Sequence, residues 1–220
     1  FSGTSIGALS ITKNGTGTQT LSGTNTYTGN VTVNAGTLQL QGGAFSGAVR
    51  DYSIASGAVL NLDGNTDIAD AGTSVISGDG TLLVTGGQLA ATSDGRDLTL
   101  SLGSDALIDI EAGGEIRNGG WQAINWSSNL ADLTVDGTLD IWDGSNVVVD
   151  ALNGSGTITK GAAFNSRTLE VGVDNGSGTF SGTIGEGGGA GSTVINFIKS
   201  GAGTQTLSGT NTYTGTTTVS

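Results

Sequence analysis

Short runs of alternating apolar and polar residues recur along the whole chain. Examples are Thr37–Leu40 (TLQL), Val59–Leu62 (VLNL) and Thr81–Val84 (TLLV). A period of two with many β-branched residues predicts strands that each bury one face. No stretch of about 12 residues keeps the 3.6 period of a helix, because glycine interrupts nearly all of them. The pattern therefore predicts an all-β chain with little or no α-helix.

The spacing of these runs indicates how the strands are connected. Leu38, Leu60 and Leu82 follow one another at a constant interval of about 22 residues, which suits one coil of a solenoid. Gly-Gly, Asp-Gly and Asn-Gly pairs separate the runs and supply positive φ at low cost. The same pairs are typical of β-hairpins. The pattern alone thus leaves two folds open, a parallel β-helix with tight corners and an antiparallel sandwich.

One stretch of the chain occurs twice. Lys13–Val33 reads KNGTGTQTLSGTNTYTGNVTV and Lys199–Val219 reads KSGAGTQTLSGTNTYTGTTTV, so about 17 of roughly 21 positions are identical. The tetrapeptide FSGT, at residues 1–4 and 180–183, precedes each copy. We expect Asn25 and Asn211 to be structural residues of a turn. Residues 1–220 are expected to form a single segment, slightly more than one unit of a longer tandem array, with related ends at 1–40 and 180–220.

The repeated stretch resembles a known family. GxGTQTLSGTNTYTG, followed by TTTV in one copy and VTVNAGTLQL in the other, is similar to the autotransporter-associated β-strand repeat. This repeat occurs in passenger regions of bacterial type V secreted surface proteins. The resemblance implies a right-handed parallel β-helix, for which this length predicts about ten rungs. It also implies display at the surface of a Gram-negative cell, outside the outer membrane, within a protein longer than this chain.

Charge and composition exclude several classes of function. The formal net charge is −12, and the seven basic residues are scattered along the chain, with no two of them adjacent. No basic stripe is available for nucleic acid. The apolar runs are too short to span a bilayer, so we expect no membrane insertion by this segment. Cysteine and histidine are absent, which removes disulfides and the commonest metal ligands.

The charged residues carry no pattern typical of catalysis. A serine nucleophile lacks a histidine base, so we expect no enzyme activity, no catalytic residues, no cofactor and no designed metal site. Arg50-Asp51 and Arg96-Asp97 are interpreted as compensation of surface charge. Mild acidic clusters lack the terminal glutamate that an EF-hand loop requires; they comprise Asp63, Asp67 and Asp70, and Asp132, Asp136, Asp140 and Asp143.

Three tryptophans, Trp121, Trp126 and Trp142, fall close together in the sequence. The surrounding segment GGWQAINWSSN is more polar than its neighbours, and exposed indole rings beside Asn and Gln are what a sugar-stacking site uses. These residues are therefore candidates for contact with a glycan. The alternative is that the rings fill a core layer or cover the corner of a rung.

The function predicted from these observations is structural and adhesive. The segment would act as a rigid stalk that presents surfaces for cell or surface adhesion or for self-association. Its partners would be another copy of the chain, or a host or environmental glycan or protein. The alternative function is a carbohydrate-binding module that uses the three tryptophans. A related expectation is that Leu100 faces the core, so that Leu100→Asp destabilises the fold strongly.

Overall fold

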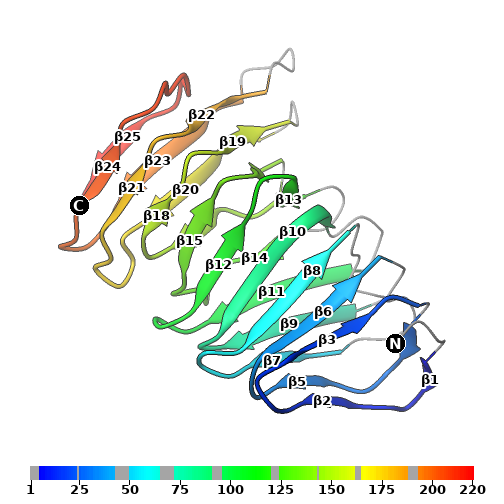
Figure 1. Cartoon of the computed structure of the whole chain (residues 1–220). Helices are drawn as coiled ribbons and strands as arrows, with labels where there is room; N and C mark the ends of the chain where they lie inside the picture. The colour runs from blue at the N-terminus through cyan, green and yellow to red at the C-terminus, as the bar shows by residue number, and fades with distance from the viewer. Residues whose placement is uncertain are drawn as a thin grey trace.

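The computed structural model describes residues 5–23, 25–42, 50–64, 72–90, 96–119, 124–142, 144–161, 165–187 and 193–220. Within these ranges the chain forms 25 strands and no helix. The strand pairs between described residues are parallel, whereas hairpins would pair antiparallel strands. The parallel β-solenoid is confirmed, and Figure 1 shows its strands stacked along one axis from the N-terminal to the C-terminal end.

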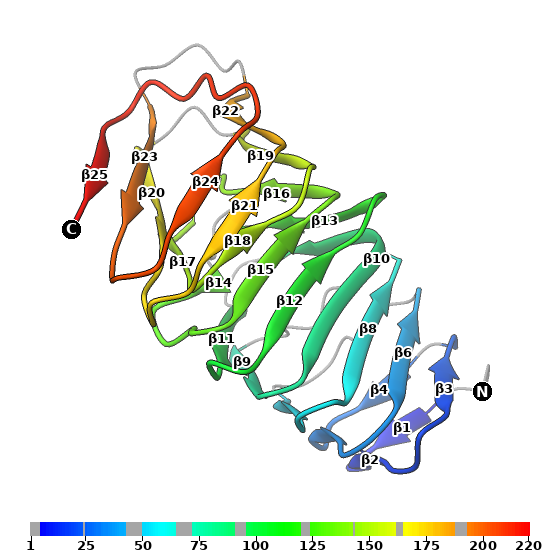
Figure 2. The same ribbon diagram turned by 60° about the vertical axis from the view of Figure 1, so that its left-hand side comes forward.

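The first face of the solenoid is a continuous ladder along which the strands lie side by side (Figure 2). Its strands are β3 (Thr18–Leu21), β6 (Thr37–Gln41), β8 (Val59–Asp63), β10 (Thr81–Ala90), β12 (Leu107–Ile110), β15 (Asp132–Val135) and β18 (Leu152–Asn153). A bridge between Gly154 and Phe180 leads on to β21 (Gly178–Phe180), which pairs with β24 (Gln205–Leu207).

The second face begins at the N-terminal end with the pair of β1 (Ser5–Gly7) and β4 (Asn25–Tyr27). Farther along, the long strand β10 turns from the first face onto the second, and its register shifts between Val84 and Gly86. The later strands of this face are β13 (Gly114–Arg117), β16 (Thr138–Asp140), β19 (Thr157–Lys160) and β22 (Thr183–Glu186).

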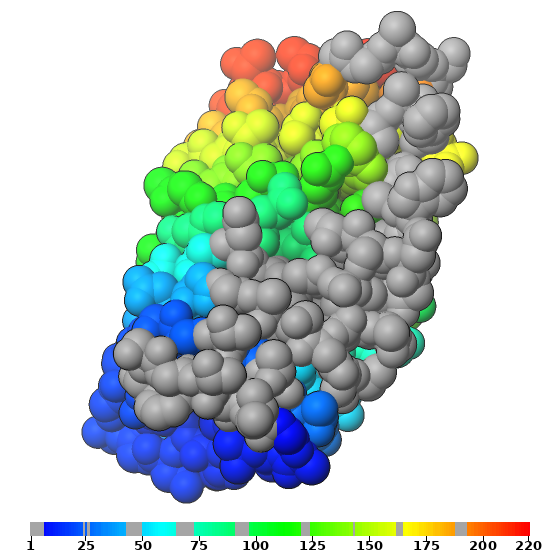
Figure 3. All heavy atoms as spheres, turned by 90° about the vertical axis from the view of Figure 1, so that its right-hand side faces the viewer, coloured from blue at the N-terminus to red at the C-terminus, as the bar shows by residue number. Residues whose placement is uncertain are grey.

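The third face completes each turn. One sheet holds β2 (Ile11–Lys13), β5 (Val31–Val33), β7 (Tyr52–Ile54), β9 (Gly72–Gly78), β11 (Arg96–Leu102) and β14 (Ile124–Asn125). A second sheet holds β17 (Val147–Val149), β20 (Arg167–Val171), β23 (Ile195–Lys199) and β25 (Thr217–Val219). The space-filling view shows the resulting order of the chain, from blue at one end of the rod to red at the other (Figure 3).

The predicted step between turns is confirmed for the three leucines that suggested it. Leu38 pairs with Leu60, and Leu60 pairs with Leu82. The next pair joins Leu82 to Ile108, so this turn is longer than the two before it. The continuous ladder of the first face makes about seven turns in the described part of the chain, so the prediction of about ten rungs was slightly too high. The reason is that some later turns use more residues than the early ones.

The core lies inside the stack of turns. Inward side chains of successive strands lie directly over one another and are fully buried, as in the row Leu38, Leu60, Leu82, Ile108 and Leu133. Leu100 of β11 is also fully buried, which confirms the predicted facing of this strand. Burying one such side chain contributes about 2–3 kcal/mol. Each row is covered by the turns before and after it, so stability is shared between neighbouring turns.

Side-chain oxygens connect the turns at many corners. Asn30 Oδ1 accepts the N–H of Asp51 at 3.1 Å, and Asp51 Oδ1 accepts that of Val75 at 3.2 Å. These bonds satisfy backbone donors where the ladder of strands is interrupted. The same arrangement links Asn146 to Thr168, Asn153 to Thr179, Asn175 to Ala202 and Asn196 to Thr216.

The Asn-Gly pair at residues 153–154 forms a corner and not a hairpin. Gly154 has φ +105°, and a Cβ there would lie 2.3 Å from the carbonyl oxygen of Val135 in the preceding turn. Only glycine allows both this dihedral and this close approach. The strands on either side of the corner pair with neighbouring turns and not with each other.

Candidate functional site

The structure does not assemble the predicted tryptophan site among its described residues. Trp121 lies outside them. Trp126 is fully buried and belongs to the hydrophobic core, so its ring offers no face to a sugar. For Trp126, the alternative in which the ring fills a core layer is therefore the one observed.

Trp142 is half-buried and occupies a corner after β16, with φ +46°. The guanidinium carbon of Arg117 lies 3.5 Å from the ring centroid, a cation–π contact from the preceding turn. On the following turn, a Cβ added to Gly161 would come within 2.6 Å of the indole ring. The ring is thus held between two turns and keeps only part of its surface for a ligand.

The acidic clusters have a structural role in the described residues. Each of three aspartates accepts a backbone N–H from the next turn, at 3.0, 2.8 and 2.8 Å, in the pairs Asp132 with Ala151, Asp136 with Ser155 and Asp140 with Gly161. Asp63 accepts from the side-chain amides of Gln39 and Gln41, while Asp67, Asp70 and Asp143 lie outside the described residues. No group of acidic side chains in the described ranges is arranged to hold a metal ion.

Two aspartates on the first face have raised pKa values. Burial raises the pKa of Asp109, and the charges of Glu111 and Asp136 raise it further. Burial also raises the pKa of Asp132, although the hydrogen bond from Ala151 opposes the shift. Acidic side chains on this face therefore repel one another. Neither of the two pKa shifts is caused by a basic residue.

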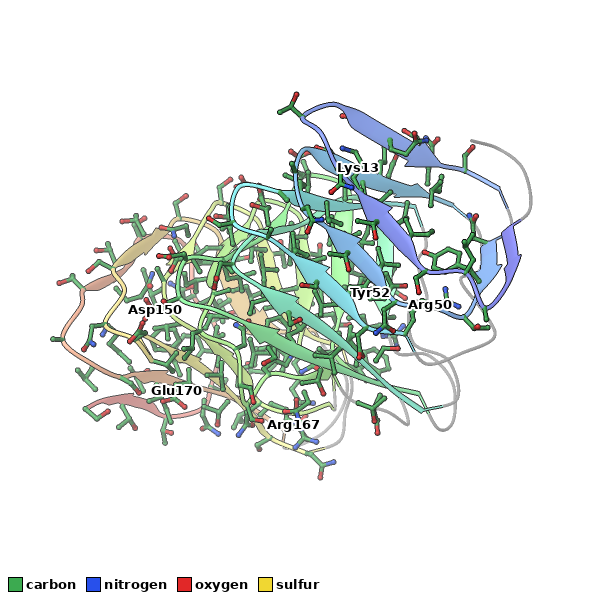
Figure 4. The ribbon with its side chains drawn as sticks, turned by 90° about the horizontal axis from the view of Figure 1, so that it is seen from below. Lys13, Arg50, Tyr52, Asp150, Arg167 and Glu170 are labelled. Carbon is green, nitrogen blue, oxygen red and sulfur yellow. The ribbon has the colours of Figure 1, made fainter. Side chains whose placement is uncertain are left out.

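The interpretation of Arg50 as a surface residue was wrong. Its side chain is fully buried, whereas the neighbouring Asp51 is exposed. The guanidinium carbon lies 4.7 Å from the centroid of the Tyr27 ring. Tyr52, two residues along the chain and also fully buried, lies beside Arg50 (Figure 4). Alternation along the extended chain explains why Arg50 is buried and Asp51 is exposed. Arg50, Tyr52 and Ile54 are alternate residues, so their side chains all point inward.

The two copies of the repeated stretch share a lysine corner. Lys13 Nζ donates to the carbonyl oxygens of Asn14 at 3.0 Å, Gly15 at 2.7 Å and Ala35 at 3.0 Å. Ala35 belongs to the next turn, so this ammonium group joins two turns. Lys199 repeats the first two bonds, donating to the carbonyl oxygens of Ser200 and Gly201.

The repeated asparagines also have the same local bond. Asn25 Nδ2 donates to the Gly23 carbonyl oxygen at 2.6 Å, and Asn211 Nδ2 donates to that of Gly209 at 3.2 Å. Both residues are therefore structural, as expected, although Asn25 begins strand β4 and does not sit in the turn itself.

A row of hydroxyl side chains runs along the third face over five consecutive turns. Its members are Thr12, Thr32, Ser53, Ser77 and Ser101, which pair in register. Each is exposed or half-buried and is flanked in its strand by a buried residue, so each points outward. Sequence reasoning missed this row because its members are not evenly spaced along the chain. Only the register of the strands brings them together.

A family model matches the two ends of the chain. The passenger-associated-transport-repeat model matches residues 11–40 and 197–220, the regions that contain the two lysine corners. Both ends of the chain carry this passenger repeat. The matched regions begin at equivalent positions of the two copies, since Ile11 and Phe197 each stand two residues before the corner lysine.

A curated relative supports the same assignment. The adhesin BmaC autotransporter of Brucella suis biovar 1 (strain 1330) is 41% identical over 105 residues, which cover 47% of this chain and 3% of that relative. The chain therefore matches only a small part of a much longer protein. The repeat and the relative together confirm the resemblance to an autotransporter passenger and the surface location that it implies.

The remaining comparisons add less. No solved structure matches the chain. Among the described residues, no helix has the length and apolar character needed to cross a membrane.

Proposed function

We propose that this chain is a structural, adhesive segment of a surface-displayed passenger, and that the hydroxyl row of the third face is its contact surface. The observation that carries the proposal is the row itself, Thr12, Thr32, Ser53, Ser77 and Ser101, on consecutive paired turns. Parallel strands hold its members about 4.8 Å apart. A regular, rigid surface of this kind loses little conformational entropy when it binds.

Charge favours this row as the place where two copies meet. The chain has a formal net charge of −12, so two copies repel each other over most of their surface. The hydroxyl row contains no ionisable side chain, and each hydroxyl group is both a donor and an acceptor. Two such rows can therefore hydrogen-bond to each other through uncharged groups, with the exposed Asp51 beside Ser53 as the nearest carboxylate of the same chain segment. The proposed partner is a second copy of the chain on the same or a neighbouring cell.

The test is self-association measured by analytical ultracentrifugation of the purified chain. Ser53→Asp and Thr32→Asp place carboxylates in the middle of the row, and we expect each to weaken association at least tenfold. Thr81→Asp, at a half-buried position of β10 on the first face whose register partners are the apolar Val59 and Leu107, is the matched control that adds the same charge elsewhere. Equal weakening by all three variants would show that net charge alone matters and that the row is not the contact.

Carbohydrate binding is the competing function. Its remaining described candidate is Trp142, the half-buried tryptophan at the corner beside Arg117. A titration of tryptophan fluorescence with polysaccharides tests this function directly. If the chain stays monomeric at high concentration and a polysaccharide shifts the emission of the wild type but not of Trp142→Phe, the homotypic proposal is wrong and the glycan function replaces it.

A further inference from the structure

Arg50 is a buried cation without a counter-charge among the described residues. Its side chain has no exposed surface, and Nε, NH1 and NH2 each lack a hydrogen-bond partner. A guanidinium group presents five N–H donors and no acceptor, and it stays charged in proteins. Removing such a charge from water without a partner is strongly unfavourable. The interior near the N-terminal end of the solenoid therefore needs negative charge.

The described groups around Arg50 do not supply that charge. The ring of Tyr27 lies 4.7 Å from the guanidinium carbon and contributes a cation–π contact, which is weaker than an ion pair. The hydroxyl group of Tyr52 is buried and also lacks a hydrogen-bond partner. Burial raises the pKa of Tyr27 to about 12, and it raises the pKa of Tyr52 as well, although the charge of Arg50 and the approach of its N–H groups to each phenol oxygen oppose both shifts. Both phenols therefore stay neutral at physiological pH.

The nearest acid in the sequence is already used. Asp51 is exposed, on the opposite side of the strand from Arg50, and its Oδ1 accepts the backbone N–H of Val75 at 3.2 Å. Asp63, on the adjoining face, accepts from two glutamine side chains. Among the described residues, this region thus contains the charged guanidinium donors of Arg50 and the neutral hydroxyl donor of Tyr52, but no free carboxylate.

We propose that Arg50 and Tyr52 form a buried binding site for a small inorganic anion of the size of chloride. The donor set selects an anion, since the guanidinium N–H groups and the phenolic O–H of Tyr52 can all donate to one ligand. The complete burial of both side chains selects a small one. Figure 4 shows the two residues beside each other at the end of the molecule that also carries Lys13. The bound anion neutralises the guanidinium and locks β7 against the turn that contains Tyr27.

The first test locates the anion. Crystals of the full chain grown in sodium bromide should give an anomalous peak within hydrogen-bond distance of the Arg50 guanidinium and the Tyr52 hydroxyl. Crystals of Arg50→Met grown in the same way should lack that peak. Absence of the peak from the wild type overturns the proposal.

The second test measures the linkage between binding and folding. A ligand that binds only the folded chain raises its stability with a saturable dependence on concentration. At constant ionic strength, replacing sodium gluconate by sodium chloride should raise the melting temperature of the wild type until the effect saturates. Tyr52→Phe removes one donor and should move the midpoint to several-fold higher chloride.

The matched variants are Arg50→Met and Arg117→Met. Both remove an arginine that lies on an aromatic ring, but Arg117 is half-buried and lies over Trp142. Arg117→Met should keep the saturable chloride effect of the wild type, and Arg50→Met should lose it. An equal chloride effect in wild type and Arg50→Met would overturn the site. So would a wild type that does not respond to chloride, because the counter-charge would then be a carboxylate of the chain itself.

Discussion

The two copies of the repeated stretch have nearly the same sequence but different surroundings. In the N-terminal copy, Val33 of β5 is fully buried, because β5 pairs with β2 on one side and β7 on the other. In the C-terminal copy, the equivalent Val219 of β25 is 77% exposed, and the described pairing of β25 is with β23 alone. The same valine is therefore a core residue or a surface residue according to whether a following turn covers it.

The repeated tyrosines show the same contrast. Tyr27 is fully buried beside Arg50. Its counterpart Tyr213 is half-buried, packs against Phe197 with the ring centroids 6.3 Å apart, and shares a hydrogen bond of 2.8 Å with Thr217. The comparison teaches that the repeat encodes strands and corners, whereas the burial of its side chains depends on the neighbouring turns.

The largest difference in stability between the two copies is expected when a charge is placed at the equivalent valines. Val33→Asp puts a carboxylate in the core and should lower the free energy of unfolding by about 4 kcal/mol or more. Val219→Asp should change it by less than about 0.5 kcal/mol, because that side chain is exposed. Chemical denaturation with urea measures both. Similar losses in the two variants would mean that a further layer covers Val219.

Truncation of the tyrosines should give the next largest difference. Tyr27→Ala removes a fully buried ring and should cost about 3–5 kcal/mol. Tyr213→Ala removes a half-buried ring and should cost about 1 kcal/mol. Thermal unfolding followed by circular dichroism measures the pair. A loss for Tyr213→Ala as large as that for Tyr27→Ala would contradict the comparison.

Alkaline pH tests the burial of Tyr27 without a change in packing. Burial raises the pKa of Tyr27 to about 12, against about 10 in an unfolded chain. The unfolded chain therefore loses this proton first, so stability is full below about pH 10 and is lost as the pH rises toward 12. This shift corresponds to about 2–3 kcal/mol. Urea denaturation between pH 9 and 12 should show a smaller loss in Tyr27→Phe than in the wild type.

The matched control for the pH experiment is Tyr213→Phe. Its hydroxyl group lies in a half-buried side chain at the C-terminal end, and this variant keeps Tyr27 beside Arg50, so the alkaline loss assigned to Tyr27 should remain in it. An identical alkaline profile for wild type and Tyr27→Phe would refute the effect assigned to Tyr27.

The lysine corners should give the smallest difference. Lys13→Met removes three hydrogen bonds from an ammonium group, one of them to Ala35 in the next turn, and should cost about 2 kcal/mol. Lys199→Met removes the two bonds to Ser200 and Gly201 and should cost about 1 kcal/mol. Equal losses, measured by urea denaturation, would show that the bond between turns contributes nothing.

Several features of the fold followed from local patterns in the sequence. Alternation placed Leu38, Leu60 and Leu82 on inward positions, and their constant step, together with the resemblance to the passenger repeat, predicted the parallel coil that pairs them in register. Leu100 was assigned to the core for the same reason. These predictions succeeded because facing within a strand is set by the geometry of consecutive residues. The predicted number of rungs was too high because the step is longer between Leu82 and Ile108 than between the earlier pairs.

The sequence by itself determined the strands, the coil, the repeated corners and the resemblance to a passenger repeat. The tertiary structure decided which side chains those turns cover: Arg50 and Trp126 became interior residues, and five hydroxyl residues lined up on one face. The physical reason is that the direction in which a side chain points depends on adjacent residues of its strand. Whether that side chain is buried depends on residues a whole turn away. Their register is set by corners whose lengths vary from turn to turn.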